Sequence, residues 1–413
     1  MSRDIRSVAI VGGGPAGAAL GAFLARGGSR RVTLFASGAR PPLVIGESLV
    51  PAIVPFLQEL GIEDEVRDYS VYKPGATFVL RDGEMSFSFD GVRGARTTYS
   101  YNVPRDRLDA SILEAARRAG AEVVETTARF RAEGDRVVLD DATLAAAPSL
   151  GGRQPDLVVD ATGRGRSFAR LFDLPTEVGE RRDTALFAHC TGVPLVIEGN
   201  VHTDHLERGW CWRIPLPGRV SVGLVIDSEF LARFGRTAEE QYDAYMAYDP
   251  AIKAWGGEPK RITPVLKYSN YQLATTKAWG GNWALVGDAF GFVDPVFSSG
   301  LLVSLDSARE LARAIEAGTD VAFDRYEEHV LHHIRNWQRV VGHFYSGRLF
   351  TLFRVGEVVR ETFLGGLMNF HFEKHLPRVF TGEATTRRYS VGLLDFMCRR
   401  GLVDNDPEDL AVR

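Results

Sequence analysis

Glycine residues near the start of the chain recur in a spacing that suits a phosphate-bearing ligand. Glycines stand at positions 12, 14 and 17, where an apolar run at residues 7–11 ends and another, at residues 16–26, begins. Such glycines allow a tight turn after a strand, close approach of the backbone to a pyrophosphate, and tight packing of a helix whose N-terminus favours an anion. The order strand, turn, helix therefore predicts a dinucleotide-binding site. Its residues are Gly12, Gly14, Ala16 and Gly17.

The end of the next predicted strand, residues 32–35, leaves the identity of the dinucleotide open. An acidic residue at this point would hold the ribose hydroxyls, but the chain reads Ala36-Ser37 there. Arg40, close by, favours a 2′-phosphate instead. This end of the site alone does not separate FAD from NADP, and it leaves open how far the missing acid weakens FAD binding.

Two later motifs favour a flavin. Residues 159–163 read Val-Asp-Ala-Thr-Gly after an apolar strand, and residues 285–288 read Leu-Val-Gly-Asp, which puts the Asp288 carboxylate at a strand end suited to polyol hydroxyls. From the residues alone, Asp288 could equally cap a helix. Together with Arg105 in a Val-Pro-Arg run, this set resembles the FAD-binding domain of the p-hydroxybenzoate hydroxylase-like flavoproteins over most of residues 1–330.

That resemblance implies bound FAD, with Asp288 on its ribityl chain. The residues predicted to contact the cofactor are Gly12, Gly14, Ala16, Gly17, Glu47, Arg105, Asp288 and Pro295. A second glycine fingerprint follows no other strand, so the sequence predicts no dedicated nicotinamide domain. Electrons would then arrive by brief docking of a reduced nicotinamide or from a partner protein.

The segment Gly-Phe-Val-Asp-Pro-Val-Phe-Ser-Ser-Gly at residues 291–300 is a candidate anion site. Pro295 stops the preceding segment, and Ser298 or Ser299 caps the helix predicted to follow, which leaves free backbone N–H groups beside Gly300. Such a helix start attracts an anion or a polarised oxygen, here a flavin carbonyl or a halide. The residues alone leave a plain capped helix as an equal alternative.

Aromatic residues alternate along another predicted strand, where residues 210–215 read Trp-Cys-Trp-Arg-Ile-Pro. Alternation places Trp210, Trp212 and Ile214 on one face, and we expect Pro215 to end the strand. An aromatic strand face is usually part of a core. Yet this pattern and the spacing Phe292-x-x-Pro295-x-x-Ser298-x-Gly300 both match motifs characteristic of flavin-dependent halogenases.

The halogenase resemblance assigns roles to both motifs. It implies that the backbone amides of Ser299 and Gly300 hold the halide, with Ser298 beside them as a catalytic residue. It also implies a passage between flavin and substrate. The passage residues are Trp210, Trp212, Ile214, Pro215 and Phe292.

Lys73 is the third element of the resemblance. A lone lysine is usually a solvated surface charge, but few charges surround this one between residues 71 and 80. In the halogenases an essential lysine lies at this point, after a Gly-Glu-Ser segment that is present here at residues 46–48. Burial would favour a neutral amine able to form a chloramine, whereas a retained charge would hydrogen-bond hypohalous acid. The sequence leaves both open.

One departure bears on the substrate, and one histidine pair on metal binding. Indole-acting relatives carry Glu where this chain has Phe297, which argues against tryptophan and favours phenols or pyrroles, whose own electrons activate the ring. His332 and His333 lie in a charged stretch, residues 327–339, and are predicted to lie on a solvated helix face. No metal site is predicted.

Composition excludes several classes of function. The 413 residues carry a net charge of −4, without the basic excess that binds nucleic acid or an anionic membrane. The uncharged stretch 7–25 is interrupted by Gly-Gly-Gly-Pro at 12–15, so it is a poor membrane span. The three cysteines are far apart and match no metal-site spacing, so a reducing cytoplasm is expected.

The predicted fold is α/β. A Rossmann-like FAD-binding domain would comprise residues 1–72, 101–177 and 263–325. A substrate-side β-sheet would be inserted at 73–100 and 178–262, and residues 326–413 would form a C-terminal helical region.

The function predicted on the resemblance is halogenation of an electron-rich aromatic ring by a two-component FAD enzyme. A separate flavin reductase would supply FADH2, chloride or bromide would be oxidised to hypohalous acid, and Lys73 would deliver the halogen to a phenol or pyrrole, free or tethered to a carrier protein. Two alternatives are an aromatic hydroxylase of the same fold, in which Lys73 is dispensable, and a non-catalytic flavin-binding sensor or scaffold.

Overall fold

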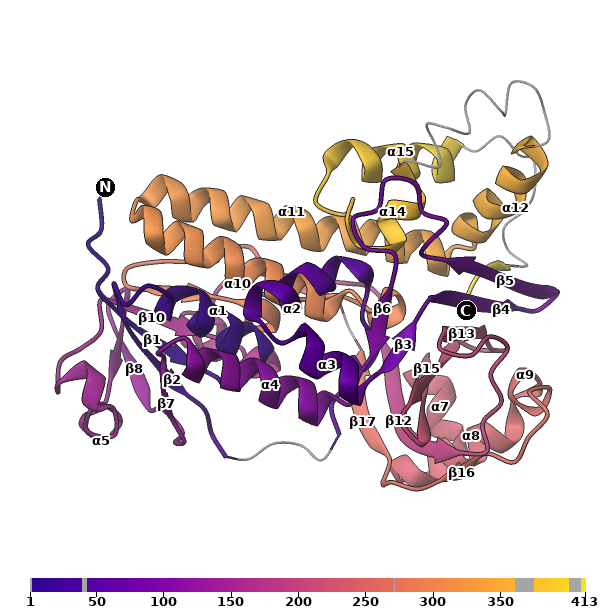
Figure 1. Cartoon of the computed structure of the whole chain (residues 1–413). Coiled ribbons are helices and arrows are strands. Elements are labelled where there is room, and N and C mark those ends of the chain that lie inside the picture. Colours follow the sequence, from indigo (N-terminus) through magenta and orange to yellow (C-terminus); the bar gives the residue numbers. More distant parts are fainter. Residues whose placement is uncertain (1, 39–42, 271, 361–374, 401–409) are drawn as a thin grey trace.

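A five-stranded parallel sheet forms the centre of the nucleotide-binding part of the molecule (Figure 1). The computed structural model describes residues 2–38, 43–270, 272–360, 375–400 and 410–413, so Arg40 lies outside it. The strands of the sheet, in spatial order, are β19 (Trp283–Leu285), β10 (Leu157–Asp160), β1 (Ser7–Val11), β2 (Arg31–Phe35) and β7 (Glu122–Val124). These strands come from distant parts of the chain, and the predicted α/β fold class is confirmed.

Three helices pack around this sheet. Helix α1 (Pro15–Ala25) lies between α4 (Arg105–Arg118) and α10 (Gly300–Ala317). Gly12 has φ +122°, and a Cβ there would lie 2.2 Å from Ala161 O. A Cβ at Gly17 would lie 2.1 Å from Gly12 O. Both glycines are therefore required by the close approach of turn, helix and strand.

A second, eight-stranded sheet lies beside the first. Its strands are β4 (Gly75–Leu80), β5 (Gly83–Ser88), β12 (Asp183–Thr191), β13 (Val201–His205), β14 (Trp210–Leu216), β15 (Arg219–Asp227), β16 (Lys260–Arg261) and β17 (Leu266–Asn270). Strand β17 pairs with β12 along its whole length, so it belongs to this sheet and not to the predicted FAD-binding segment that starts at residue 263. The short strands β3 (Val71–Lys73) and β6 (Ser100–Asn102) pair with each other between the two sheets.

Smaller elements complete these two parts. They are β8 (Phe130–Glu133), β9 (Arg136–Leu139), β11 (Thr176–Val178), β18 (Leu273–Thr275), β20 (Gly291–Phe292), α2 (Val54–Leu60), α3 (Glu63–Tyr69), α5 (Asp141–Ala145), α6 (Ser167–Leu171), α7 (Ser228–Leu231), α8 (Ala238–Tyr248) and α9 (Pro250–Lys253). Residues of α7, α8 and α9 bury one face of the second sheet in a separate core. The opposite face of that sheet joins the main core.

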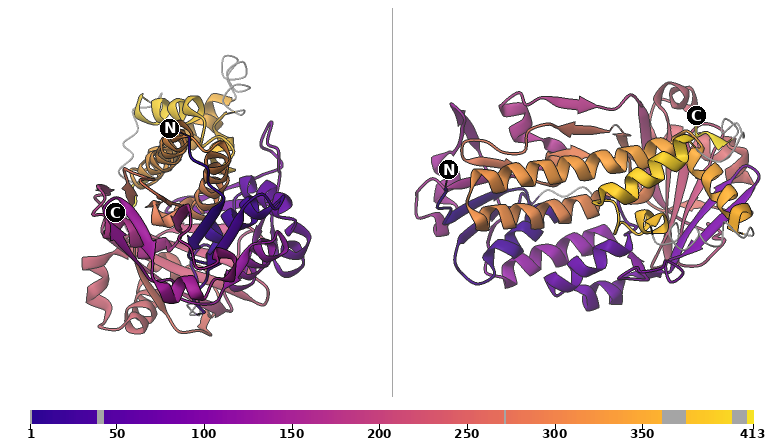
Figure 2. Two further views of the ribbon diagram at one scale, coloured as in Figure 1. Left: turned by 90° about the vertical axis from the view of Figure 1, so that its left-hand side faces the viewer. Right: turned by 90° about the horizontal axis from the view of Figure 1, so that it is seen from above.

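The C-terminal part is helical, as predicted, and lies along α10 (Figures 1 and 2). Its elements are α11 (Asp320–Tyr345), α12 (Arg348–Arg360), α14 (Pro377–Phe380) and α15 (Arg388–Arg400). The prediction that His332 and His333 lie on a solvated face is wrong for His333, which is 2% exposed because α11 packs against α10 on that side. Among the described residues, no helix combines the length and apolar character needed to cross a membrane.

Candidate functional site

A cleft open to solvent lies where the first sheet, α1 and α10 face the second sheet. The space between its walls, counted out into the adjoining solvent, is about 1030 Å³, and residues around both sheets contribute to the walls. It gathers most of the residues singled out in the sequence. Those that line it are Gly14, Ala16, Arg105, Trp210, Trp212, Ile214, Asp288, Phe292, Pro295, Ser298 and Gly300.

The glycine turn forms one end of this cleft. A Cβ at Gly14 would meet no atom within 4 Å, so the backbone there is open to a ligand. Gly14 precedes α1, whose free N–H groups and dipole suit a pyrophosphate. Gly12 and Gly17 do not line the cleft but shape it through the close packing described above.

Arg105 and Asp288 form the next part of the wall. Arg105 Nε donates to Asp109 Oδ1 at 2.9 Å, which fixes the guanidinium at the start of α4. Burial raises the pKa of Asp288 to about 6, against the opposing effects of Arg105 and Arg164. The Asp288 carboxylate follows β19, where parallel strands commonly present ligand groups, and it is suited to accept hydrogen bonds from ribityl hydroxyls.

Glu47 does not reach the cleft, although its neighbours Gly46 and Ser48 line it. Its side chain is buried, and Oε1 lies 2.8 Å from His189 Nε2. Arg219 Nε donates to His189 Nδ1 at 3.0 Å, so the histidine carries its hydrogen on Nε2 and donates it to Glu47. The side chain thus helps to fix the segment around Ser48, and a contact of Glu47 with the cofactor stays a prediction.

The segment before α10 has the features of an anion site. Ser298 has φ +55°, and this left-handed conformation turns the chain directly into the helix. Gly300, at the first position of the 18-residue helix, would place a Cβ in open space. Ser299 is fully buried, and its Oγ has no hydrogen-bond partner among the described residues. Ser298 and Gly300 line the cleft, whereas Ser299 is buried behind them and does not line it.

The tryptophan strand is tied to this segment by a residue that the sequence did not single out. Trp210 Nε1 donates to Tyr345 Oη at 2.9 Å, and Tyr345 Oη donates to Asp294 Oδ2 at 2.8 Å. Asp294 Oδ1 in turn accepts from Val296 N at 3.0 Å. Strand β14 runs on to Leu216, so Pro215 does not end it as predicted, and Pro215 does not line the cleft.

Lys73 lies outside the cleft but is linked to it. The residue is 2% exposed, and Nζ donates to Ser48 Oγ at 2.8 Å and to Leu49 O at 2.7 Å. Burial lowers the pKa of Lys73 to about 7. Since Ser48 also lines the cleft, this residue lies between the cavity and the amine. Ser48 belongs to the Gly-Glu-Ser segment noted in the sequence, but only the fold shows that its hydroxyl lies against Lys73 Nζ.

Aromatic rings fill the space on the lysine side. The ring centroid of Phe297 lies 6.4 Å from that of Phe78 and 5.6 Å from that of Phe380. Phe78 continues through Phe87 to Phe89, whose ring centroid is 5.5 Å from Lys73 Nζ. These contacts join residues of the second sheet, the segment before α10 and the C-terminal helix α14, which are far apart along the chain, so the sequence did not indicate the cluster.

Known proteins with the same features identify the family. The tryptophan halogenase family model matches residues 81–348, and an FAD-binding domain model matches residues 6–140. The chain is 30% identical to flavin-dependent halogenase armH3 of Armillaria mellea, over 75% of this chain and 67% of that protein. It is 27% identical to the 1H-pyrrole-2-carbonyl-[peptidyl-carrier protein] chlorinase of Pseudomonas fluorescens, over 86% of each.

A solved structure agrees with these matches along nearly the whole chain. The myxobacterial chondrochloren halogenase CndH, described as a variant of FAD-dependent halogenases, is 26% identical and covers 99% of both chains with a TM-score of 0.67. The FAD-binding match starts at residue 6 and so includes the glycine turn at one end of the cleft. The chain belongs to the tryptophan halogenase family, and it is a flavin-dependent halogenase.

Proposed function

We propose that this halogenase transfers chlorine or bromine to a phenol or pyrrole through hypohalous acid and Lys73. The observation that carries the proposal is the separation of the cleft from Lys73, with Ser48 as the group that touches both. An oxidant formed in the cleft must leave it to reach the amine, because Lys73 itself does not line the cavity. A small, uncharged hypohalous acid fits that requirement.

FAD, when reduced and exposed to O2, supplies the oxidising equivalent that converts halide to hypohalous acid. The residues that would hold the cofactor are Gly14 and Ala16 at the pyrophosphate and Arg105 and Asp288 farther along. The start of α10 at Gly300 would hold the halide, since its free N–H groups and the helix dipole favour an anion. Trp210, Trp212 and Ile214 form an apolar wall that excludes water from the path of the oxidant.

Lys73 has the surroundings that this role requires. With a pKa of about 7, roughly half of the amines are neutral at neutral pH. A neutral Nζ forms an N–halogen bond with hypohalous acid while the oxygen leaves as water with a proton from the amine. A protonated Nζ instead donates a hydrogen bond to hypohalous acid and orients its halogen. Both routes need the amine buried beside Ser48, where its orientation is fixed.

The aromatic cluster around Phe297 supports a substrate that activates its own ring. Phe297 is buried among Phe78, Phe344 and Phe380, and no carboxylate occupies its position to assist an indole. A phenol or pyrrole needs no such help. The similarity to a chlorinase that acts on a carrier-bound pyrrole supports the inclusion of carrier-tethered substrates in the test.

The experiment is a turnover assay with an added flavin reductase, NADH and FAD on a panel of free and carrier-tethered phenols and pyrroles. Each substrate is incubated in chloride or in bromide, and the isotope pattern of the product is read by mass spectrometry. Free and tethered tryptophan serve as the indole controls. We expect halogenated phenol or pyrrole and no halogenated indole; halogenation of the indole alone would overturn the assignment of Phe297. Omission of the reductase tests the proposed need for a partner, because the halogenated product should then fall to trace amounts.

A further inference from the structure

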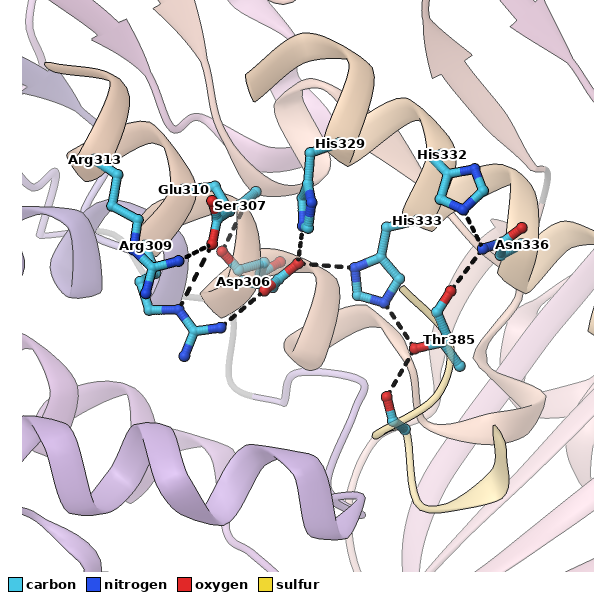
Figure 3. Close-up of polar contacts among 12 residues, drawn as sticks. Asp306, Ser307, Arg309, Glu310, Arg313, His329, His332, His333, Asn336 and Thr385 are labelled. Atoms are coloured by element: carbon cyan, nitrogen blue, oxygen red, sulfur yellow. Dashed lines mark hydrogen bonds and ion pairs between the residues drawn. The ribbon is translucent and has the colours of Figure 1, made fainter. Parts of the chain in front are cut away.

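A group of buried polar side chains joins the second turn of α10 to α11. Figure 3 shows His329 and His333, one helical turn apart on α11, both pointing at Asp306 of α10. Asp306 Oδ2 lies 2.8 Å from His329 Nε2 and 3.0 Å from His333 Nδ1. These three atoms all lie within 4.8 Å of one another. No step of the proposed halogenation uses this group.

The burial of the three side chains differs in a way that matters for a ligand. Asp306 is 5% exposed and His333 2%, while His329 is half-buried and faces solvent on one side. The group therefore has one buried end and one end open to ions from solution.

Further hydrogen bonds orient the Asp306 carboxylate and the His333 ring. Arg309 Nη2 donates to Asp306 Oδ1 at 3.2 Å, which leaves Oδ2 directed at the two rings. On the far side of the second ring, His333 Nε2 lies 3.0 Å from Thr385 Oγ1, and Thr385 donates to Gly382 O at 2.8 Å. Trp337 Nε1 donates to the same Nε2 at 3.2 Å, so without an ion His333 carries its hydrogen on Nδ1, toward Asp306. Thr385 Oγ1 is placed to accept a hydrogen from Nε2 in the other tautomer. Such outer contacts commonly fix the histidine tautomer at metal centres.

We propose that Asp306, His329 and His333 bind a divalent transition-metal ion of the zinc class. Two imidazole nitrogens and one carboxylate oxygen are a common ligand set for Zn²⁺, with water in the fourth position. Two histidines four residues apart on a helix lie on the same face and reach one ion. The water would enter at the exposed edge of His329.

Binding would exchange protons for the ion. Each ring nitrogen that faces Asp306 Oδ2 must give up its hydrogen, either to the other nitrogen of the ring or to solvent, and then donates its lone pair to the metal. In His333 the hydrogen moves from Nδ1 to Nε2, where Thr385 Oγ1 can accept it, so the hydrogen bond that Trp337 Nε1 makes to Nε2 at 3.2 Å is lost. The charge of Arg309 also opposes the ion. We therefore expect a site that a chelator can empty, and whose ion stabilises the packing of α10 on α11.

The test uses the whole FAD-loaded protein, first treated with a chelator and then freed of it. Zn²⁺ is titrated against a chromophoric competitor, and Co²⁺ is added separately to look for the visible ligand-field band of a four-coordinate nitrogen and oxygen site. We expect one ion per chain, a Co²⁺ band, and a higher melting temperature with Zn²⁺ than with Mg²⁺.

The variants are His333→Gln, Asp306→Asn and, as the matched control, His332→Gln. His332 is adjacent to His333 on α11, but its Nε2 lies 2.9 Å from Asn336 Nδ2, outside the proposed ligand set. We expect His333→Gln and Asp306→Asn to abolish the Co²⁺ band and the zinc-dependent stabilisation, and His332→Gln to keep both. Retained FAD absorbance establishes that each variant is folded. Absence of stoichiometric Zn²⁺ binding in the wild type, or equal loss in His332→Gln, would overturn the proposal and leave Asp306 as part of a proton-linked ion pair only.

Discussion

Removal of the Ser48 hydroxyl tests the link between the flavin cleft and Lys73. Ser48 Oγ is one of two acceptors for Lys73 Nζ, at 2.8 Å, and it lines the cleft. In Ser48→Ala a buried N–H group loses its partner, which costs about 1–3 kcal/mol. If that loss falls on halogen transfer, the rate of product formation drops about 5- to 150-fold. The reduced stabilisation of the ammonium form should also lower the Lys73 pKa further.

The assay separates oxidant formation from halogen transfer. FADH2 is supplied in limiting amounts, the halogenated product is measured by mass spectrometry, and escaped hypohalous acid is captured by an amine in solution. For Ser48→Ala we expect unchanged consumption of FADH2, less product and more captured oxidant.

The matched control is Ser100→Ala. Ser100 is the strand partner of Lys73 and fully buried, yet its hydroxyl has no hydrogen-bond partner among the described residues. This variant should behave as the wild type. The reasoning is refuted if Ser48→Ala yields as much product per flavin as Ser100→Ala, or if product and captured oxidant fall together.

Three further changes test other parts of the account. Gly14→Val would place a side chain in the space that the pyrophosphate needs, so FAD binding should be lost in equilibrium dialysis while the circular dichroism spectrum is retained. Tyr345→Phe breaks the link from Trp210 to Asp294; we expect KM for halide to rise with FAD affinity unchanged, and equal halide kinetics in the variant would contradict this. Lys73→Met should stabilise the fold at neutral pH by up to a few kcal/mol, because burial lowers the pKa of Lys73 from 10.5 to about 7. Between these two pH values the unfolded chain holds a proton on Lys73 that the folded chain lacks. The free energy of unfolding of the wild type should therefore rise from pH 7 to pH 10.5, and its difference from that of Lys73→Met should shrink. Denaturant titrations at several pH values measure both.

Most of the candidate site could be predicted from local sequence motifs. The glycine turn, Asp288 and the segment before α10 each depend on one strand end or one helix start, where a few adjacent residues determine the backbone. Their positions relative to one another follow once the parallel sheet forms, because its strands end at one edge. The alternating Trp210 and Trp212 likewise share a face of β14 as expected.

What the sequence missed depends on contacts between distant segments. The Glu47 carboxylate lies against His189, 142 residues away, and no motif indicated this contact. His333 was expected in solvent because its neighbours along the chain are charged, yet α10 covers it. Tyr345 carried no motif, and its role depends on the packing of α11 against both β14 and the loop at Asp294. Linear spacing holds no information on such pairings.

The claim that halogen reaches the substrate through Lys73 is tested most directly by Lys73→Ala, with captured oxidant and halogenated product measured per FADH2 consumed. The account predicts that this variant binds FAD and releases hypohalous acid at the wild-type rate, because Lys73 does not line the cleft. Loss of the group that holds and orients the oxidant should lower the rate of product formation at least about a thousandfold. Near wild-type halogenation by Lys73→Ala, with reductase and halide in excess, would contradict the account and remove this lysine from the mechanism.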